Sequence, residues 1–190
     1  LRIFDQARVA VVNLDMDHVD EVLARAGRCE RVVTLSAREE AAGRADVWAS
    51  DICSQQGSVS FTVHSTRGQR AMRVSMPGLF NVDNALAALA CGLVMGLDPV
   101  QMAQGLACAS VPGRMELVRT ASPKVCALVD YAHNKLSFQR FFASVAQEFA
   151  GRMVISVFGA PGDKALERRR VLPEEASRHS DLIIYTEEIG

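Results

Sequence analysis

Apolar and polar positions along the chain predict two series of strands and helices. In the first series, the runs at 7–14 and 31–35 are rich in β-branched and small apolar residues, as buried strands are. Between them, at 19–26, apolar residues recur at helical spacing, and Gly27 supplies a stop signal. This β-α-β order favours a parallel sheet, because a helical crossover is the usual link between parallel strands.

Three short strands are predicted next, at 47–52, 58–64 and 71–76, with glycines between them. In the last two of these strands apolar residues alternate with polar ones, and this period of two predicts antiparallel hairpins with one face in water. The segment 81–95 is rich in Ala and Leu and apolar nearly all round, which predicts a deeply buried helix.

A domain boundary is predicted near residue 112. Asp98 and Pro99 form the N-cap and first turn of a further helix that extends to about Ser110. The sequence Val-Pro-Gly at 111–113 then breaks the helical pattern. We therefore divide the chain into residues 1–112 and 113–190.

The second series has the order expected of another α/β sheet. We expect the helix nearest the C-terminus to be interrupted at Pro173, because proline lacks the N–H that a helix interior needs. A sheet with so few strands is small, so we expect this C-terminal domain to be incomplete. The predicted strands are 116–119, 125–130, 153–158 and 182–185, and the predicted helices are 136–149 and 167–179.

Composition excludes several classes of protein. The 190 residues are 49% hydrophobic and 23% charged, which is ordinary for a globular protein, and the net charge of −1 gives no electrostatic reason to expect nucleic acid or an anionic membrane as a partner. No apolar run approaches the roughly 20 residues of a membrane span. The N-terminus has neither an initiator Met nor a signal-peptide pattern, so we interpret it as a cut inside a longer protein.

The five cysteines form no C-x-x-C pair, which argues against a zinc ribbon. They are widely spaced and mostly flanked by apolar residues. We therefore expect buried, reduced thiols in a cytoplasmic protein.

The stretch Asp130-Tyr131-Ala132-His133-Asn134 carries the most informative chemistry. It follows the apolar run 125–129, so a carboxylate, an imidazole and an amide emerge together where a buried strand ends. Ligands of open α/β sheets bind at the carboxyl ends of strands, and such a cluster can hold a ribose, a phosphate or a metal ion. The alternative is a strand-end turn with a helix cap, which needs only one Asp or Asn.

Three more polar groups are candidates for a binding site. Asn81 either caps the predicted helix or offers an amide that suits an adenine edge, and Asn84, which we expect to be buried, offers the same group. Arg114 either bridges two domains or forms paired hydrogen bonds with a nucleotide phosphate. The glycine-flanked loop 159–164 either cradles an anion or is a tight turn.

Taken in order, these motifs resemble the Mur ligase family. The order is F-N-V-D-N-A-L-A-A, then G-R-M-E, then V-D-Y-A-H-N, then V-F-G-A-P-G-D-K, and the opening V-V-N-L-D-M-D also looks like a strand end of that family. The resemblance covers essentially the whole chain. It is greatest to the members that add the third residue of the peptidoglycan stem peptide.

The resemblance implies an α/β fold and an ATP-dependent amide ligase. Residues 1–112 would be the second half of a central ATPase domain, with a mixed sheet and helices, and 113–190 the first half of a Rossmann-like C-terminal domain. In these ligases ATP phosphorylates the carboxylate of a UDP-N-acetylmuramoyl dipeptide, and the amino group of a diamino acid attacks the acyl phosphate. Catalysis is then mainly positioning and charge neutralisation around phosphates.

The resemblance also implies roles for single residues. Asn84 matches the asparagine that reads adenine, Arg114 the interdomain arginine that contacts the nucleotide, and Asp130 the acidic residue that reaches the ribose. His133 lies near the phosphates as the catalytic candidate, and Asn134 belongs to the same nucleotide-binding cluster. Closure of the two domains would bring Asp130 to ATP, so Asn84, Arg114 and Asp130 would line one cleft.

Two departures from the family pattern concern the cofactors and the amino-acid substrate. The chain contains no G-x-x-G-K-T phosphate loop and no lysine of the kind that the family carbamylates, so ATP and magnesium would be held mainly by other parts of the protein, and this chain alone would not turn over ATP. Lys164 stands where diaminopimelate-adding enzymes have arginine, and Glu187-Glu188-Ile189 stands in place of the D-D-N of their T-D-D-N-P-R motif. These differences favour lysine, ornithine or another diamino acid, with Glu188 pairing with its ammonium group, unless the two glutamates are only a solvated strand end.

Rival interpretations are two other ligases and a non-catalytic module. A folylpolyglutamate synthase-like ligase shares the D-x-A-H-N motif, and a cyanophycin synthetase has a similar cluster within a larger chain. A degenerate ligase that has lost its phosphate loop would be a partner-binding protein. For the ligase interpretation we expect a cytoplasmic monomer with no nucleic-acid or membrane partner and no metal ligands in this chain.

Overall fold

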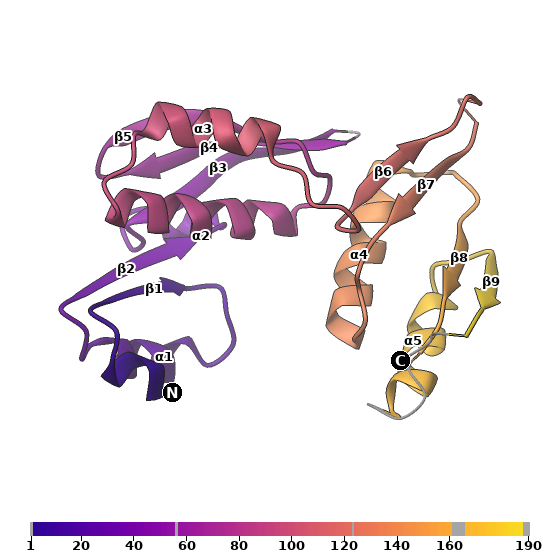
Figure 1. Cartoon of the computed structure of the whole chain (residues 1–190), viewed down its shortest axis with the longest axis horizontal. Helices are drawn as coiled ribbons and strands as arrows, with labels where there is room; N and C mark the ends of the chain where they lie inside the picture. The colour runs from indigo at the N-terminus through magenta and orange to yellow at the C-terminus, as the bar shows by residue number, and fades with distance from the viewer. Residues whose placement is uncertain (1, 56, 123, 161–165, 188–190) are drawn as a thin grey trace. The chain divides into compact units, whose positions relative to one another are not determined.

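The computed structural model describes residues 2–55, 57–122, 124–160 and 166–187. The chain forms two compact units, Leu1–Ser110 and Val111–Gly190, called here the N-terminal and C-terminal units. Figure 1 shows strands and helices in each of them. Each unit has its own hydrophobic core, and each is described by itself below.

The N-terminal unit contains a five-stranded sheet in the order β1-β2-β3-β4-β5. The β1–β2 and β2–β3 pairs are parallel, whereas β3, β4 and β5 form antiparallel hairpins, so both predictions for this sheet are confirmed. The strands are β1 (Val9–Asn13), β2 (Arg31–Ser36), β3 (Val47–Gln55), β4 (Ser58–Ser65) and β5 (Gly68–Val74). The helices are α1 (Val19–Ala26), α2 (Phe80–Val94), α3 (Pro99–Cys108) and the short 3₁₀ turns η1 (Arg2–Asp5) and η2 (Glu39–Ala41).

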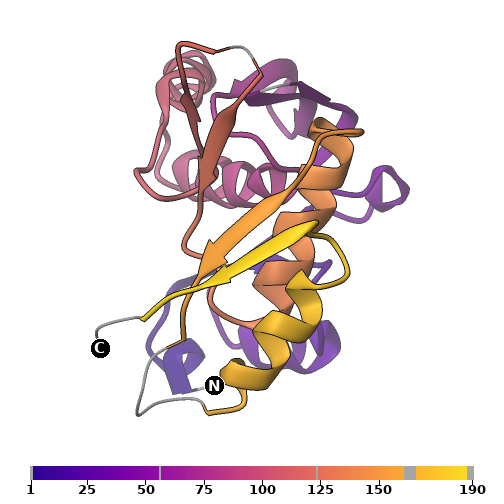
Figure 2. The same ribbon diagram turned by 90° about the vertical axis from the view of Figure 1, so that its right-hand side faces the viewer.

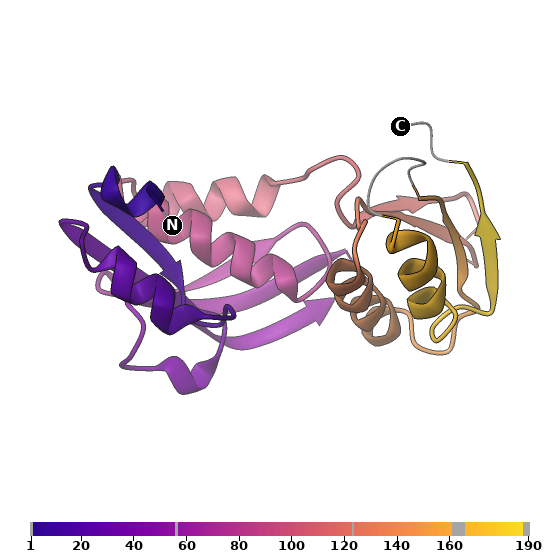
Figure 3. The same cartoon turned by 90° about the horizontal axis from the view of Figure 1, so that it is seen from below.

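Helices α2 and α3 lie side by side over the sheet (Figure 3). Val82, Leu86 and Leu89 of α2 are buried against the sheet core, but Asn84 and Cys91 on the outer side are exposed. The expectation of a deeply buried helix is therefore confirmed for the face toward the sheet and wrong for the outer face. The outer face of α2 carries small apolar residues such as Ala88, which is why the sequence looks like that of a buried helix. In the described part of the unit, no element covers that face.

Caps and breakers define the ends of the helices. The Asp98 carboxylate accepts a hydrogen bond from the backbone N–H of Val100 at 3.1 Å, which confirms the predicted N-cap of α3. In the C-terminal unit Pro173 lies inside helix α5 (Arg168–Ala176) and does not interrupt it. The helix continues past Pro173 because the Pro173 carbonyl still accepts a hydrogen bond from Ser177 N–H at 2.9 Å. Proline itself fails to make only the one hydrogen bond that a backbone N–H at this position would donate.

The C-terminal unit contains two separate pairs of strands. Strands β6 (Glu116–Arg119) and β7 (Cys126–Val129) form an antiparallel hairpin, and β8 (Ile155–Phe158) pairs with β9 (Leu182–Tyr185) in parallel. Figure 2 shows β8 and β9 side by side near α4 (Lys135–Glu148) and α5. The expected single β-α-β-α-β sheet was wrong in one respect, because β7 pairs with its hairpin partner and not with β8.

Aromatic rings fill the core of the C-terminal unit. Phe138 packs edge-to-face on both Phe142 and Phe158, with centroids 5.8 Å and 5.2 Å away. The Glu175 side chain, only 4% exposed, accepts hydrogen bonds from Gln139 at 3.2 Å and from Arg178 at 3.0 Å. Because the carboxylate is paired, its burial against the aromatic core is compatible with a stable fold.

The five cysteines are free thiols, but their expected burial was wrong. Cys53, Cys91 and Cys108 are exposed, and the other two are half-buried. Apolar neighbours in sequence do not bury a residue on the outer face of a strand or helix. Among the described residues, no helix has the length and apolar character needed to cross a membrane.

Candidate functional site

Polar side chains of the N-terminal unit gather where β1 ends. The Asn13 side-chain oxygen accepts a hydrogen bond from Asp15 N–H at 2.8 Å, which fixes the turn after the strand. The Asn13 amide also donates to the Asp83 carboxylate at 3.2 Å, in the first turn of α2. These contacts join the carboxyl end of a parallel strand to the start of the buried helix, which is where ligands of such sheets bind.

The Asp15 carboxylate joins the end of β1 to the end of β2. One oxygen accepts the Ser36 hydroxyl at 2.8 Å and the other accepts Ala37 N–H at 2.7 Å. The Arg38 guanidinium lies 3.4 Å from the same carboxylate and is itself largely exposed. Asp15 is therefore held by the two strand ends, while Arg38 presents a positive charge beside it.

Asn81 and Asn84 form a pair in the first turns of α2. Asn81 is 4% exposed, and its amide donates to the Pro77 carbonyl at 2.7 Å, so it lies inside the helix and does not cap it. Asn84 donates to the Asn81 side-chain oxygen at 3.1 Å, but it is exposed, contrary to the expected burial. In the described part of the chain this leaves the Asn84 carbonyl oxygen and one amide hydrogen available, which still suits the edge of a purine base.

The Asp130 carboxylate organises the candidate site of the C-terminal unit. It follows β7, and its two oxygens accept the backbone N–H groups of Met115 and Ala132, each at 2.8 Å. Met115 is 1% exposed and has a φ of 48°, a left-handed conformation that a side chain of this size rarely adopts. Asp130 thus holds the turn that carries Arg114 against the end of its own strand.

Arg114, Tyr131 and His133 lie together around Asp130. The Arg114 guanidinium lies 4.9 Å from the centre of the Tyr131 ring, a cation–π contact, and the Tyr131 and His133 rings are 5.1 Å apart. His133 Nδ1 lies 2.9 Å from the Tyr131 carbonyl oxygen. Because a carbonyl only accepts, Nδ1 carries a hydrogen and donates it, which leaves Nε2 as the ring nitrogen for a ligand.

Asn134 is the N-cap of α4. Its side-chain oxygen accepts Ser137 N–H at 2.9 Å, and the Ser137 hydroxyl accepts the backbone N–H of Asn134 at 3.0 Å and that of His133 at 3.1 Å. This reciprocal pair is a capping box. The helix-cap alternative therefore describes Asn134, and the Ser137 hydroxyl of the same cap holds the backbone of the loop that carries His133.

The structure brings together four of the seven predicted site residues: Arg114, Asp130, His133 and Asn134. Asn84 belongs to the N-terminal unit, and Lys164 and Glu188 lie outside the described residues. Within the described ranges, no group of three or more His, Cys, Asp or Glu side chains has the arrangement of a metal site.

Three residues were given no role of their own from the sequence and gain one in the folded chain. Tyr131 lies beneath Arg114, Asp83 contacts Asn13, and Ser137 completes the cap of α4. The N-x-x-S spacing of Asn134 and Ser137 is the one local signal that was available in the sequence. The Asn13–Asp83 contact joins residues 70 positions apart, so no local pattern indicates it.

Two sequence families match consecutive parts of the chain. The family described as "Mur ligase middle domain" matches residues 1–92, and that described as "Mur ligase, glutamate ligase domain" matches residues 113–189. Similar curated proteins include a UDP-N-acetylmuramoyl-L-alanyl-D-glutamate--2,6-diaminopimelate ligase from Corynebacterium efficiens, 33% identical over 94% of this chain and 33% of its own length. A UDP-N-acetylmuramyl-tripeptide synthetase from Roseiflexus sp. is 34% identical over 97% of this chain and 35% of its own.

Solved structures have the same fold. MurF from Acinetobacter baumannii superposes with a TM-score of 0.77 at 24% identity, over 95% of this chain and 39% of its own. Folylpolyglutamate synthase from Mycobacterium tuberculosis, complexed with ADP, gives a TM-score of 0.75 at 23% identity over 94% of this chain and 38% of its own. The chain thus spans about a third of the length of the curated relatives that it matches.

Proposed function

Because this chain belongs to the Mur ligase family, we propose that it is part of an ATP-dependent ligase that adds a diamino acid to a UDP-N-acetylmuramoyl dipeptide in peptidoglycan synthesis. Residues 1–112 are the second half of its central ATPase domain, and residues 113–190 are the first half of its C-terminal ligase domain. The observation that carries the proposal is the Asp130 carboxylate, fixed by two backbone N–H groups beside the Arg114 guanidinium and the His133 ring.

The residues of the C-terminal unit fit the ribose and phosphates of a nucleotide. A carboxylate has about four lone-pair sites, and Asp130 uses two of them for backbone N–H groups, so the others can accept the two ribose hydroxyls. The guanidinium of Arg114 offers planar donors for a phosphate, and its packing on Tyr131 reduces its freedom before a ligand arrives.

Asn84 in the N-terminal unit and His133 in the C-terminal unit each offer a further group that fits a nucleotide. The available oxygen and amide hydrogen of Asn84 match the acceptor and donor of an adenine edge. His133 is exposed and its Nδ1 contacts the Tyr131 carbonyl, so Nε2 is the ring nitrogen left for a ligand. Asn134 supports this role by capping α4, so we assign it to positioning.

ATP, when bound, supplies the phosphoryl group that activates the substrate carboxylate. This chain contributes positioning and positive charge: Arg114 offsets phosphate charge, and Asp130 orients the ribose. Magnesium would be held mainly by the phosphate loop and the carbamylated lysine of the family, neither of which is present in the sequence of this chain.

The amino-acid substrate is assigned to a diamino acid such as lysine or ornithine. The support comes from the sequence, with Lys164 in place of arginine and Glu188 available for a side-chain ammonium group. The relative from Corynebacterium efficiens is named for diaminopimelate, itself a diamino acid, whereas the name tripeptide synthetase specifies no amino acid. In the full-length parent protein, phosphate release should be faster with lysine than with diaminopimelate, and the opposite order would refute the assignment.

The same assay tests the reaction itself. Phosphate release by the full-length protein should require both the UDP-N-acetylmuramoyl dipeptide and the amino acid. Release that depends instead on a folate and glutamate would identify a folylpolyglutamate synthase-like ligase, and no release with either set would indicate a non-catalytic module.

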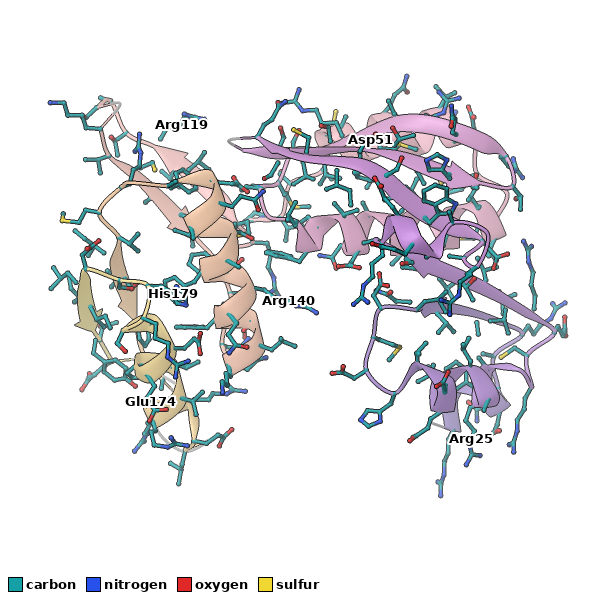
Figure 4. All side chains as sticks on the ribbon, turned by 180° about the vertical axis from the view of Figure 1, so that it is seen from behind. Arg25, Asp51, Arg119, Arg140, Glu174 and His179 are labelled. Atoms are coloured by element: carbon teal, nitrogen blue, oxygen red, sulfur yellow. The ribbon has the colours of Figure 1, made fainter. Side chains whose placement is uncertain are left out.

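Arg114→Ala tests the nucleotide site within this reaction. We expect the KM for ATP to rise about tenfold, equivalent to about 1.4 kcal/mol of lost binding. The matched control is Arg119→Ala, which removes the same charge from the other end of β6, where Figure 4 labels it. Equal effects of the two substitutions would show that Arg114 acts only through net charge.

A further inference from the structure

A small cavity in the N-terminal unit lies between the β4–β5 hairpin and helices α2 and α3. Its volume is about 60 Å³, and its floor is apolar, formed by Met72 of β5, Leu89 of α2 and Met102 of α3 among others. A water molecule needs on the order of 15 Å³ on this measure, so the cavity has room for about four waters or a tail of about three carbons.

The polar part of the cavity lining consists of Ser65, Gln69 and two arginines, which carry its only charges among the described lining residues. Arg67 lies in the turn between β4 and β5, and Arg70 follows it near the start of β5. Both side chains are exposed, and within the described ranges neither guanidinium makes an ion pair or a side-chain hydrogen bond. No described residue that lines the cavity is acidic, so the rim carries uncompensated positive charge.

The geometry of β5 directs Arg70 toward the cavity. Side chains two residues apart leave a strand on the same face, and Met72 is buried in the core beneath α2 and α3. Arg70 therefore stands on the helix-covered face next to that apolar floor. Arg73 leaves β5 on the opposite face and is also exposed.

We propose that this cavity binds a short-chain organic carboxylate, with its apolar tail on Met72 and Met102 and its carboxylate between Arg67 and Arg70. The apolar floor alone would accept any small hydrophobic group, but the two unpaired guanidiniums select an anion. The proposal does not depend on the ligase reaction. The cavity lies near Leu93 of α2, nine residues from Asn84, which corresponds to about 14 Å along the helix.

Sodium butyrate is the probe, titrated into the 190-residue chain while methionine methyl groups are observed by NMR. We expect saturable shifts of the Met72 and Met102 signals, with a Kd on the order of 1 mM for so small a ligand. The exposed methyl groups of Met95 and Met153 serve as internal controls and should not move. The absence of a saturable shift at Met72 and Met102 would overturn the proposal.

Matched ligands and variants separate the two parts of the recognition. Butanol, which has the tail without the charge, should bind at least about threefold more weakly, and Arg70→Gln should weaken butyrate by a similar factor without affecting butanol. Arg73→Gln removes the same charge from the other face and should leave the Kd unchanged. Equal affinities for butanol and butyrate, equal effects of the two substitutions, or binding of inorganic phosphate as tight as that of butyrate would each refute the assigned chemistry.

Discussion

Replacing Asp130 with asparagine should destabilise the turn that carries Arg114, independently of any nucleotide. The carboxylate accepts two backbone N–H groups, and one of them belongs to Met115, which is almost fully buried. An asparagine has one oxygen and one NH₂ group, so its oxygen can accept only one of the two backbone N–H groups. Its NH₂ group then faces the other N–H, and two donors cannot form a hydrogen bond with each other.

The size of the effect follows from the burial of Met115. A buried N–H group left without an acceptor costs about 1–3 kcal/mol. Met115 would also lose the hydrogen bond to residue 130 that holds its left-handed backbone conformation in place. We expect the free energy of opening at the Met115 amide to fall by about 2 kcal/mol, which is roughly a thirtyfold faster exchange. The single tryptophan, Trp48, lies in the N-terminal unit and would not report this change, so amide hydrogen exchange at Met115 is the appropriate measurement.

Glu116→Gln is the matched control for this experiment. Its carboxylate accepts Gly113 N–H at 2.8 Å in the same turn, but the side chain is exposed, so the substitution should change the opening free energy by less than about 0.5 kcal/mol. If Asp130→Asn has no greater effect on Met115 than Glu116→Gln, the carboxylate does not hold the turn, and the structural part of the argument is wrong.

Three further predictions concern other features of the chain. Asn134→Ala removes the N-cap of α4 and should lower the stability of the C-terminal unit by about 1 kcal/mol, measured by urea unfolding followed by circular dichroism. Asn134→Asp keeps a capping oxygen and should retain most of that stability. Equal losses from the two substitutions would contradict the cap. Gly78→Ala should destabilise the N-terminal unit by about 1–3 kcal/mol in Trp48-monitored unfolding, because Gly78 has a φ of 96° and an added Cβ would overlap the Phe80 ring. An unfolding midpoint unchanged by Gly78→Ala would show that this turn tolerates a side chain. Gly43→Ala is the comparison, because Gly43 has a φ of 77° but open space around it, so only the backbone strain is added there. The 190-residue chain should release no phosphate from ATP above a buffer blank, since it contains no G-x-x-G-K-T loop, and measurable turnover would refute this.

The local elements were predictable because their signals are local. Helix α1 and strands β6 and β9 have the predicted bounds, and most other elements are shifted by one to three residues. The N-cap at Asp98 could be found because an acidic residue followed by proline is a strong start signal. The β-α-β order likewise fixed the parallel pairing of β1 and β2 before any tertiary contact was known.

The failures occurred where tertiary contacts decide the outcome. Asn84 was expected to be buried because its helix is rich in Ala and Leu, but exposure depends on which side of α2 faces the sheet. The antiparallel partner of β7 was missed because a four-residue strand fits either a hairpin or a parallel sheet. The candidate site residues of the C-terminal unit were proposed from their motif, and their role stays a prediction. The Met115–Asp130 and Arg114–Tyr131 contacts that connect them could be seen only in the folded hairpin.

The hairpin also explains why Arg114 and Asp130 should act as a pair. Glu116 of β6 is paired with Val129 of β7, so the residues just outside this pair, at 115 and 130, are forced into contact. The backbone N–H of Met115 and Ala132 then hold the carboxylate in one orientation before any ligand binds. A ligand that uses this carboxylate avoids an ordering cost of about 0.5–1.5 kcal/mol per side chain. Glutamate at position 130 keeps the charge but adds a methylene, which moves both oxygens away from these donors, so it should lose the turn and the preorganised acceptor together.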